Sequence, residues 1–207
     1  MEPILIKLLL LIPLAYLLGS IPSGYVLVRI FAGGDVREKG SKNIGATNVT
    51  RVAGPMLGLL TLGGDFFKGA FPVYLAVLIA RPFSVPTEIF VSLVAFFSFM
   101  GHLYPVFTGF RGGGKGVATT AGCFFILAPV ACGVSFLIFV ILVFVFKRVS
   151  VASMGGAAIL PFSVWITSGE AVISICALVM SVLIVIRHRD NVKRLLLNQE
   201  PVIWKKK

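Results

Sequence analysis

The sequence predicts an all-α integral membrane protein with seven transmembrane helices, its N-terminus outside the cell and its C-terminus in the cytoplasm. The chain of 207 residues is 57% hydrophobic, has a mean hydropathy of +1.00 and carries only 13% charged residues. A soluble core with a polar shell cannot be built from this composition. Because each helical span needs about 20 apolar residues, we expect a single membrane domain over residues 1–207.

Apolar runs locate the spans. The first run is too long for the apolar part of a signal peptide, so it is interpreted as a span. The fourth run, residues 117–146, would form a single helix of about 45 Å, which is overlong, so we expect a break near Pro129. The seven expected spans cover about residues 4–30, 54–80, 86–107, 114–128, 130–146, 152–168 and 170–186.

Charge placement decides the orientation of these spans. With seven spans, every lysine and arginine lies on one face except Lys7 and Arg81, on the opposite face, and Lys68, inside a span. The positive-inside rule makes the basic face cytoplasmic. A single long fourth span would instead separate Arg111 from Lys147 across the membrane. Membrane topology thus explains the formal charge of +11, and no nucleic-acid partner is expected.

The first cytoplasmic loop, residues 35–54, has the composition of a phosphate-binding segment. Its glycines allow backbone N–H groups to converge on an anion, and its side chains supply further donors. The donors are Ser41, Asn43, Thr47, Asn48 and Arg51. A solvated, turn-rich loop is the alternative, and composition alone favours it about two to one.

The second cytoplasmic loop reads FRGGGKG and leads into the fourth apolar run. It lacks the Walker spacing, because Gly116 and Val117 follow Lys115. A glycine-rich backbone, a lysine and a helix N-terminus nevertheless all favour an anion. We therefore expect Gly113, Gly114, Lys115 and Gly116 to contribute to a phosphate site.

Two further segments place polar residues on the same face. Ser150 follows Lys147 and Arg148 and is equally well explained as a helix N-cap. The segment RHRDNVKRL contains His188, Arg189 and Asn191, and a basic cluster there would also serve as a lipid anchor.

Charged residues within the spans have a structural explanation. Asp65 and Lys68 are three residues apart and are expected to form an ion pair, more as a structural clamp than as part of a site. His102 lies near the cytoplasmic end of the third span. The three cysteines show no metal-ligand spacing, so no metal or cofactor is expected.

Together these segments resemble the PlsY family of bacterial acyl-phosphate:glycerol-3-phosphate acyltransferases. The motifs are GSKNIGATNVTR, GHLYPVF with GGKGVAT, and RHRDNVKRL, and the similarity runs from about Gly19 to Glu200. The resemblance implies a multi-pass enzyme of the bacterial cell membrane whose active site faces the cytoplasm. It implies transfer of a fatty acyl group from acyl phosphate to the 1-hydroxyl of sn-glycerol 3-phosphate, giving 1-acylglycerol 3-phosphate and phosphate, the first acylation of phospholipid synthesis. Its partners would be both substrates, membrane lipid and the enzyme that makes acyl phosphate.

Matching the motifs residue by residue assigns the site. The implied catalytic residues are Ser41, Asn43, Arg51, Lys115 and His188, and the implied substrate-binding residues are Thr47, Asn48, Gly113, Gly114, Gly116, Ser150, Arg189 and Asn191. Three positions depart from the family pattern: Lys42 and Asn198 stand where glycine is usual, and Gly112 to Gly114 replace a pair of glycines.

No soluble-type nucleophile is evident, which suits a substrate that brings its own activation. An acyl phosphate is a mixed anhydride with a good leaving group. We therefore expect the enzyme to act mainly by orienting the alcohol and by stabilising negative charge. Because Arg187 and Arg189 flank His188 and favour its neutral form, we expect it to position substrate phosphate as a donor. An anion transporter is the rival interpretation, but no internal repeat supports it.

Overall fold

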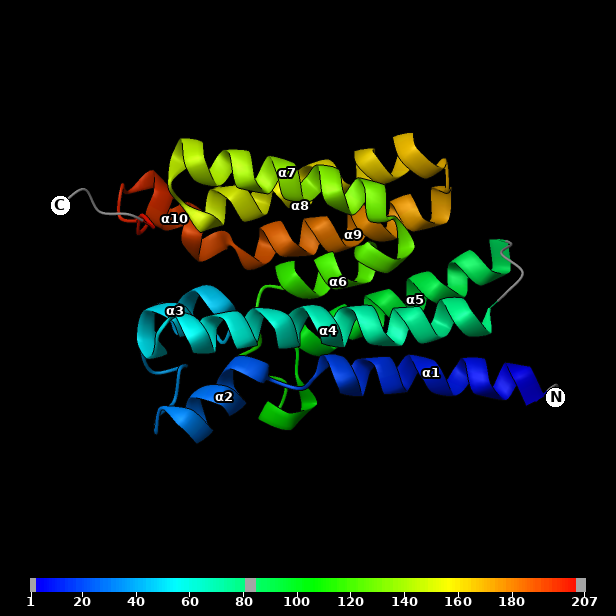
Figure 1. Ribbon diagram of the computed structural model, residues 1–207, viewed down its shortest axis with the longest axis horizontal. Coiled ribbons are helices and arrows are strands. Elements are labelled where there is room, and N and C mark those ends of the chain that lie inside the picture. The colour runs from blue at the N-terminus through cyan, green and yellow to red at the C-terminus, as the bar shows by residue number, and fades with distance from the viewer. Residues whose placement is uncertain (1–2, 81–84, 204–207) are drawn as a thin grey trace. The chain divides into compact units, whose positions relative to one another are not determined.

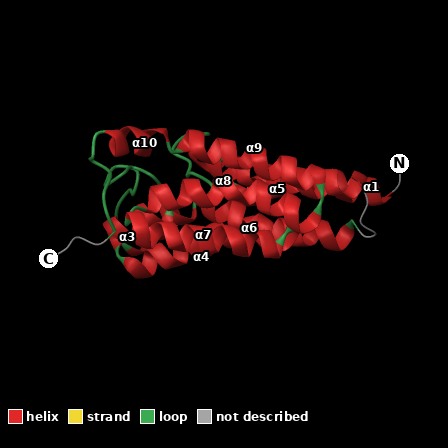
Figure 2. Cartoon of the chain, turned by 90° about the horizontal axis from the view of Figure 1, so that it is seen from above, coloured by secondary structure: helices red, strands yellow, loops and turns green. Residues whose placement is uncertain are grey.

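The computed structural model describes residues 3–80 and 85–203, which form ten α-helices and one short 3-10 helix, with no strand among them (Figures 1 and 2). Arg81 and Lys205 to Lys207, which the sequence assigns to the outer face and to the cytoplasmic tail, lie outside the described residues. The chain divides into two compact units, Met1–Leu127 and Ala128–Lys207.

In the first unit the long helix α4 is the central element. It packs against α1, α2, α3, α5 and α6. The elements of this unit are α1 (Pro3–Gly19), α2 (Ser23–Phe31), α3 (Ala46–Ala53), α4 (Pro55–Ile79), α5 (Val85–Leu103), the 3-10 helix η1 (Val106–Thr108) and α6 (Val117–Leu127).

In the second unit α8 packs against both α7 and α9. The elements are α7 (Pro129–Phe146), α8 (Val149–Ser168), α9 (Ala171–Arg187) and α10 (Arg189–Leu196), and α10 continues from α9 after a bend of 52° (Figure 1).

The helices confirm a membrane protein of the all-α class. Among the described residues, four helical segments are long and apolar enough to cross a bilayer, and two bent pairs raise the number to six. The remaining apolar helix, α6, has 11 residues and measures about 17 Å, roughly half of the hydrocarbon thickness. The count of seven spans stays a prediction that requires α6 as a short member.

Proline shapes two of the helix boundaries. The expected first span is interrupted between Gly19 and Ser23, and its two halves meet at 42°. Pro22 lies in this interruption, where it lacks an N–H and restricts the residue before it. The break expected near Pro129 is present, with Ala128 in a non-helical conformation, φ −147° and ψ 71°, between α6 and α7.

Glycines bring two pairs of helices of the first unit into backbone contact. A Cβ at Gly19 of α1 would lie 2.0 Å from the carbonyl oxygen of Ser98 in α5. A Cβ at Gly122 of α6 would lie 2.0 Å from the carbonyl oxygen of Phe66 in α4. Small residues permit such close packing where lipid supplies no hydrophobic drive for helix association. The first contact fixes α5 against α1, and the second fixes α6 against α4. Helices α5 and α6 flank the glycine-rich loop.

Candidate active site

The first predicted loop, residues 35–54, is anchored on a small apolar core. Val36 and Ile44 of the loop are buried with Val28 of α2 and Val49 of α3. Tyr25 packs against this cluster, and the Arg37 guanidinium lies 4.3 Å from the centre of its ring. Val36 and Ile44 therefore anchor the loop, although residues 38–42 between them are exposed.

Asn48 organises the loop from within. Its side-chain Oδ1 accepts a hydrogen bond from the Ser41 amide at 2.8 Å. Its Nδ2 donates to the carbonyl oxygens of Val36, Lys39 and Asn43, at 2.9 to 3.2 Å. Because Asn48 is only 2% exposed, these bonds satisfy an amide that would otherwise be costly to bury.

The other predicted side chains of this loop lie at its surface. Ser41, Thr47 and Arg51 are exposed, and the last two are one helical turn apart on α3. Asn43 is partly buried, and its Oδ1 accepts from the Gly45 amide at 2.8 Å, which forms an Asx turn before α3. Asn48 thus supports a segment that presents hydroxyl and guanidinium groups outward.

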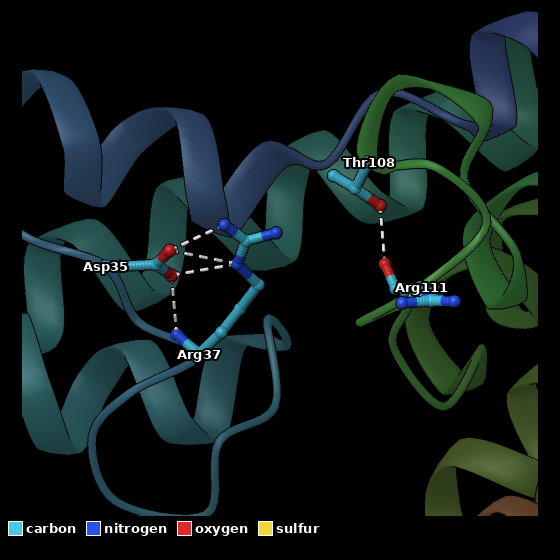
Figure 3. Close-up of polar contacts among 4 residues, drawn as sticks. All are labelled: Asp35, Arg37, Thr108 and Arg111. Carbon is cyan, nitrogen blue, oxygen red and sulfur yellow. Dashed lines mark hydrogen bonds and ion pairs between the residues drawn. The ribbon is translucent and has the colours of Figure 1, made fainter.

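The two predicted loops of this unit meet at Arg37. Its side chain forms a forked ion pair with Asp35, with the closest N–O distance at 2.6 Å (Figure 3). The hydrogen bonds from the Arg37 side chain hold the pKa of Asp35 below its ordinary value. A Cβ at Gly112 would lie 3.1 Å from Cδ of Arg37. Across the neighbouring turn the Thr108 hydroxyl donates to the Arg111 carbonyl oxygen (Figure 3).

The glycine-rich loop lies against the last turn of α5, and close packing explains its composition. Added Cβ atoms would approach the Leu103 carbonyl oxygen from Gly113, the His102 ring from Gly114 and the Phe99 ring from Gly116, each at 2.0 to 2.1 Å. The Gly114 amide donates to the His102 carbonyl oxygen at 3.1 Å.

Backbone conformation and exposure complete the description of this loop. Gly112 and Gly116 have φ of +68° and +88°, which L residues rarely adopt. Lys115 is half-buried. The loop therefore holds its lysine on a backbone that packing against α5 fixes.

In the second unit, Glu200 joins two of the predicted residues. Its Oε1 accepts from the Ser150 hydroxyl at 2.7 Å and from Asn191 Nδ2 at 2.6 Å, while its Oε2 accepts from Arg194 Nε at 2.8 Å. Burial of the carboxylate opposes its ionisation, yet these three hydrogen bonds outweigh burial and hold the pKa of Glu200 below its ordinary value. Ser150 therefore bonds to a carboxylate, and no capping bond from Arg148, the N-cap of α8, is present.

A Schellman turn at the end of α10 directs Glu200 back toward α8. Asn198 has φ of +55°. Its amide bonds to the Leu195 carbonyl oxygen at 3.0 Å, and the Gln199 amide bonds to that of Arg194 at 2.7 Å. Asparagine tolerates the left-handed conformation better than most residues, which explains why it can replace the usual glycine here. Lys42 adopts the same conformation, with φ of +57°, without that advantage.

His188 lies at the junction of α9 and α10 and is 2% exposed. Its Nδ1 is 2.8 Å from the Ile184 carbonyl oxygen. Because a carbonyl oxygen can only accept, Nδ1 carries the proton, and Nε2 of the neutral ring is then an acceptor. Arg189, the next residue, is exposed.

The predicted residues thus form two groups, one in each unit. The first loop and the glycine-rich loop adjoin in the first unit, and Ser150 and Asn191 share one carboxylate in the second. Sequence reasoning missed Glu200. The signal was present, since it is an isolated acid beyond the basic segment 187–194 at the end of the recognised similarity.

The comparisons with known proteins agree with the resemblance. Residues 9–198 match the family model described as glycerol-3-phosphate acyltransferase. A glycerol-3-phosphate acyltransferase of Syntrophotalea carbinolica is 44% identical over 186 residues, which cover 90% of this chain and 92% of that protein. One from Clostridium acetobutylicum is 38% identical over 198 residues, which cover 95% of this chain and all of that protein.

A solved structure has the same fold. It is PlsY, an integral membrane glycerol 3-phosphate acyltransferase, in its glycerol 3-phosphate form, with a TM-score of 0.89, 37% identity and 96% coverage of both chains. Its lysophosphatidic acid form has a TM-score of 0.83 at 36% identity. The chain therefore belongs to the glycerol-3-phosphate acyltransferase family of integral membrane enzymes.

Proposed function

We propose that the chain transfers a fatty acyl group from acyl phosphate to the 1-hydroxyl of glycerol 3-phosphate, releasing lysophosphatidic acid and inorganic phosphate. The observation that carries this proposal is the 37% identical PlsY structure, which was solved in forms with glycerol 3-phosphate and with lysophosphatidic acid. The hydroxyl oxygen attacks the acyl carbonyl carbon, the bond from that carbon to the phosphate oxygen breaks, and the hydroxyl proton goes to the departing phosphate. Phosphate is a good leaving group, so orientation and charge stabilisation supply most of the acceleration.

The reaction is assigned to the cytoplasmic face of a bacterial inner membrane. If both bent pairs and the short helix α6 each count as a span, the chain crosses seven times and its N-terminus lies outside. The first loop and the glycine-rich loop then share the basic face, which the contact between Arg37 and Gly112 supports.

The exposed donors are assigned to the two phosphate groups. Ser41, Asn43 and the loop 113–116 hold one phosphate. Lys115 and Arg51 hold the second. Arginine suits bidentate phosphate binding and lysine acts as a point charge.

The remaining predicted residues assist this arrangement. Thr47 in the first unit and Arg189 in the second add exposed donors. Ser150 donates its hydroxyl proton to Glu200 and therefore acts through that carboxylate. Asn48 acts through the loop, because its amide already holds the Ser41 backbone. No protein nucleophile takes part.

His188 orients the glycerol through Nε2. The sequence favours a phosphate-binding donor, but the bond from Nδ1 to Ile184 makes Nε2 of the neutral ring an acceptor for a hydroxyl. His188→Gln keeps an amide acceptor and should retain much more activity than His188→Ala. Equal loss in both variants, with rescue of His188→Ala alone by added imidazole, would instead identify His188 as a general base.

The direct test uses purified protein with acyl phosphate and glycerol 3-phosphate, and detects the lyso product by mass spectrometry. Acyl-CoA in place of acyl phosphate is the donor control and should give no product. Lys115→Ala should remove most of the activity while the protein stays folded, because a phosphate loses its fixed cation. Product from acyl-CoA alone would refute the proposed donor, and unchanged kinetics of Lys115→Ala would refute the assigned role of the loop.

A further inference from the structure

A buried charged network lies between α4 and α5 of the first unit. Lys68 Nζ is 2.8 Å from Asp65 Oδ1, and His102 Nδ1 is 3.6 Å from the same oxygen. All three residues are at most 7% exposed. Asp65 and Lys68 come from α4 and His102 from the last turn of α5, so the network joins the two helices.

The network reaches the break between α1 and α2. Lys68 Nζ also donates to the Ile21 carbonyl oxygen at 2.8 Å, which accepts from the Ser23 amide as well, at 3.0 Å. Its own carbonyl oxygen accepts from the Ser98 hydroxyl at 2.8 Å, one helical turn before His102. A clamp would need only the ion pair, whereas this arrangement also fixes the position of the last turn of α5 relative to α4.

At its other end the network contacts the glycine-rich loop. The carbonyl oxygen of His102 accepts from the Gly114 amide. The ring of His102 fills the space that a side chain at Gly114 would need. The residue after Gly114 is Lys115, which the proposed function assigns to a substrate phosphate. Any shift of the His102 ring therefore displaces the backbone that carries this lysine.

We propose that Asp65, Lys68 and His102 act as a positioning network that holds the glycine-rich loop, and with it Lys115, in the geometry for phosphate binding. The Asp65 carboxylate faces the imidazole from α4, with 3.6 Å between Asp65 Oδ1 and His102 Nδ1, and the imidazole occupies the space beside Gly114. Buried ion pairs contribute more reliably to specificity of arrangement than to stability, and supporting shells of this kind determine how well a site is placed. The inference rests on the proposed role of Lys115.

The test compares Gly114→Ala, His102→Ala and the double variant with wild type. Gly114→Ala forces a methyl group into the space of the His102 ring. It should raise KM by roughly tenfold or more, and the affected substrate should be the one whose KM also rises in Lys115→Ala. The double variant removes the obstructing ring, so it should be no worse than His102→Ala alone. Gly63→Ala is the matched control, because a Cβ at this α4 position meets nothing within 4 Å.

Two conservative variants separate positioning from folding. His102→Asn and Asp65→Asn keep polar atoms in place and should fold, with a smaller KM rise for that same substrate than His102→Ala. Normal KM values in folded Gly114→Ala or His102→Ala, or effects confined to melting temperature, would overturn the network proposal while leaving Lys115 in its role. If Lys115→Ala itself has normal kinetics, the assignment of the loop to phosphate binding fails. The positioning role proposed for the network then fails as well.

Discussion

Glu200→Ala offers the sharpest test of the second group of residues. The substitution removes the acceptor of Ser150 and Asn191, both at most 5% exposed, and of Arg194, whose side chain is 32% exposed. Hydrogen bonds to a charged group contribute about 1.5–3 kcal/mol each when buried, and the partly exposed Arg194 pair about 0.5 kcal/mol. Because one oxygen serves both buried donors, we expect a combined loss of about 3 kcal/mol.

This loss should be visible in detergent solution. At about 2–4 °C per kcal/mol for a chain of this size, Glu200→Ala should lower the melting temperature by roughly 6–12 °C. Activity at low temperature should also fall, since Ser150 and Asn191 lose the group that orients them. Glu200→Gln keeps an oxygen acceptor and should cost only about 1 kcal/mol. Gln199→Ala, an exposed neighbour, is the control.

The same carboxylate predicts a pH dependence. The pKa of Glu200 is lower in the folded protein than its ordinary value of 4.5. Its contribution to stability is therefore complete above that ordinary value and is lost as the pH falls through the lower folded value. The melting temperature of wild type should drop more steeply below pH 4.5 than that of Glu200→Gln. Parallel curves, or a Glu200→Ala variant as stable and active as Gln199→Ala, would refute the role of Glu200.

Three further predictions follow from the first loop and the topology. Lys42→Gly relieves the left-handed conformation and should raise stability by up to about 1 kcal/mol, whereas Lys39→Gly should not; a lower melting temperature for Lys42→Gly contradicts this. Asn48→Asp loses the amide donors and should weaken glycerol 3-phosphate binding through the loop, measured as a rise in KM; an unchanged KM would separate Asn48 from the site. A single cysteine at the exposed position Ser41 should react with an impermeant thiol reagent only from the cytoplasmic side, and labelling of intact cells would reverse the topology.

The sequence predicts the fold correctly where the length of an apolar run and the positions of charged residues determine it. The break at Pro129 followed from the excessive length of the fourth run and from the positions of Arg111 and Lys147. The interruption around Pro22 was not predicted, because residues 4–30 are apolar throughout and hydropathy does not distinguish one helix from two joined at an angle. Helix α3 was missed because eight residues inside a loop bury one short face against Val36 and Ile44, and its sequence has no apolar run.

For the candidate site, the sequence identified residue types and could not predict how they are used. The glycines of the second loop were interpreted as an anion cradle. In the structure Gly113 and Gly114 are required first by the approach of α5, and the Gly114 amide is bonded to His102. Both uses need a residue without a side chain, so composition cannot separate them. The contact that separates them joins residues twelve apart across a turn, which periodicity does not reveal.

A common pattern connects the exposed and buried polar residues. Exposed Ser41 is held by buried Asn48, half-buried Lys115 follows the glycine that His102 supports, and Ser150 and Asn191 share Glu200. An acyl phosphate supplies its own leaving group, so an enzyme that uses it needs no activated nucleophile and depends on alignment. Alignment of small anions by loops at a membrane surface requires rigid support, since loops are otherwise the mobile part of a fold. The buried polar residues are therefore expected to be as sensitive to substitution as the groups that touch substrate, and their substitution should raise KM as well as lower stability.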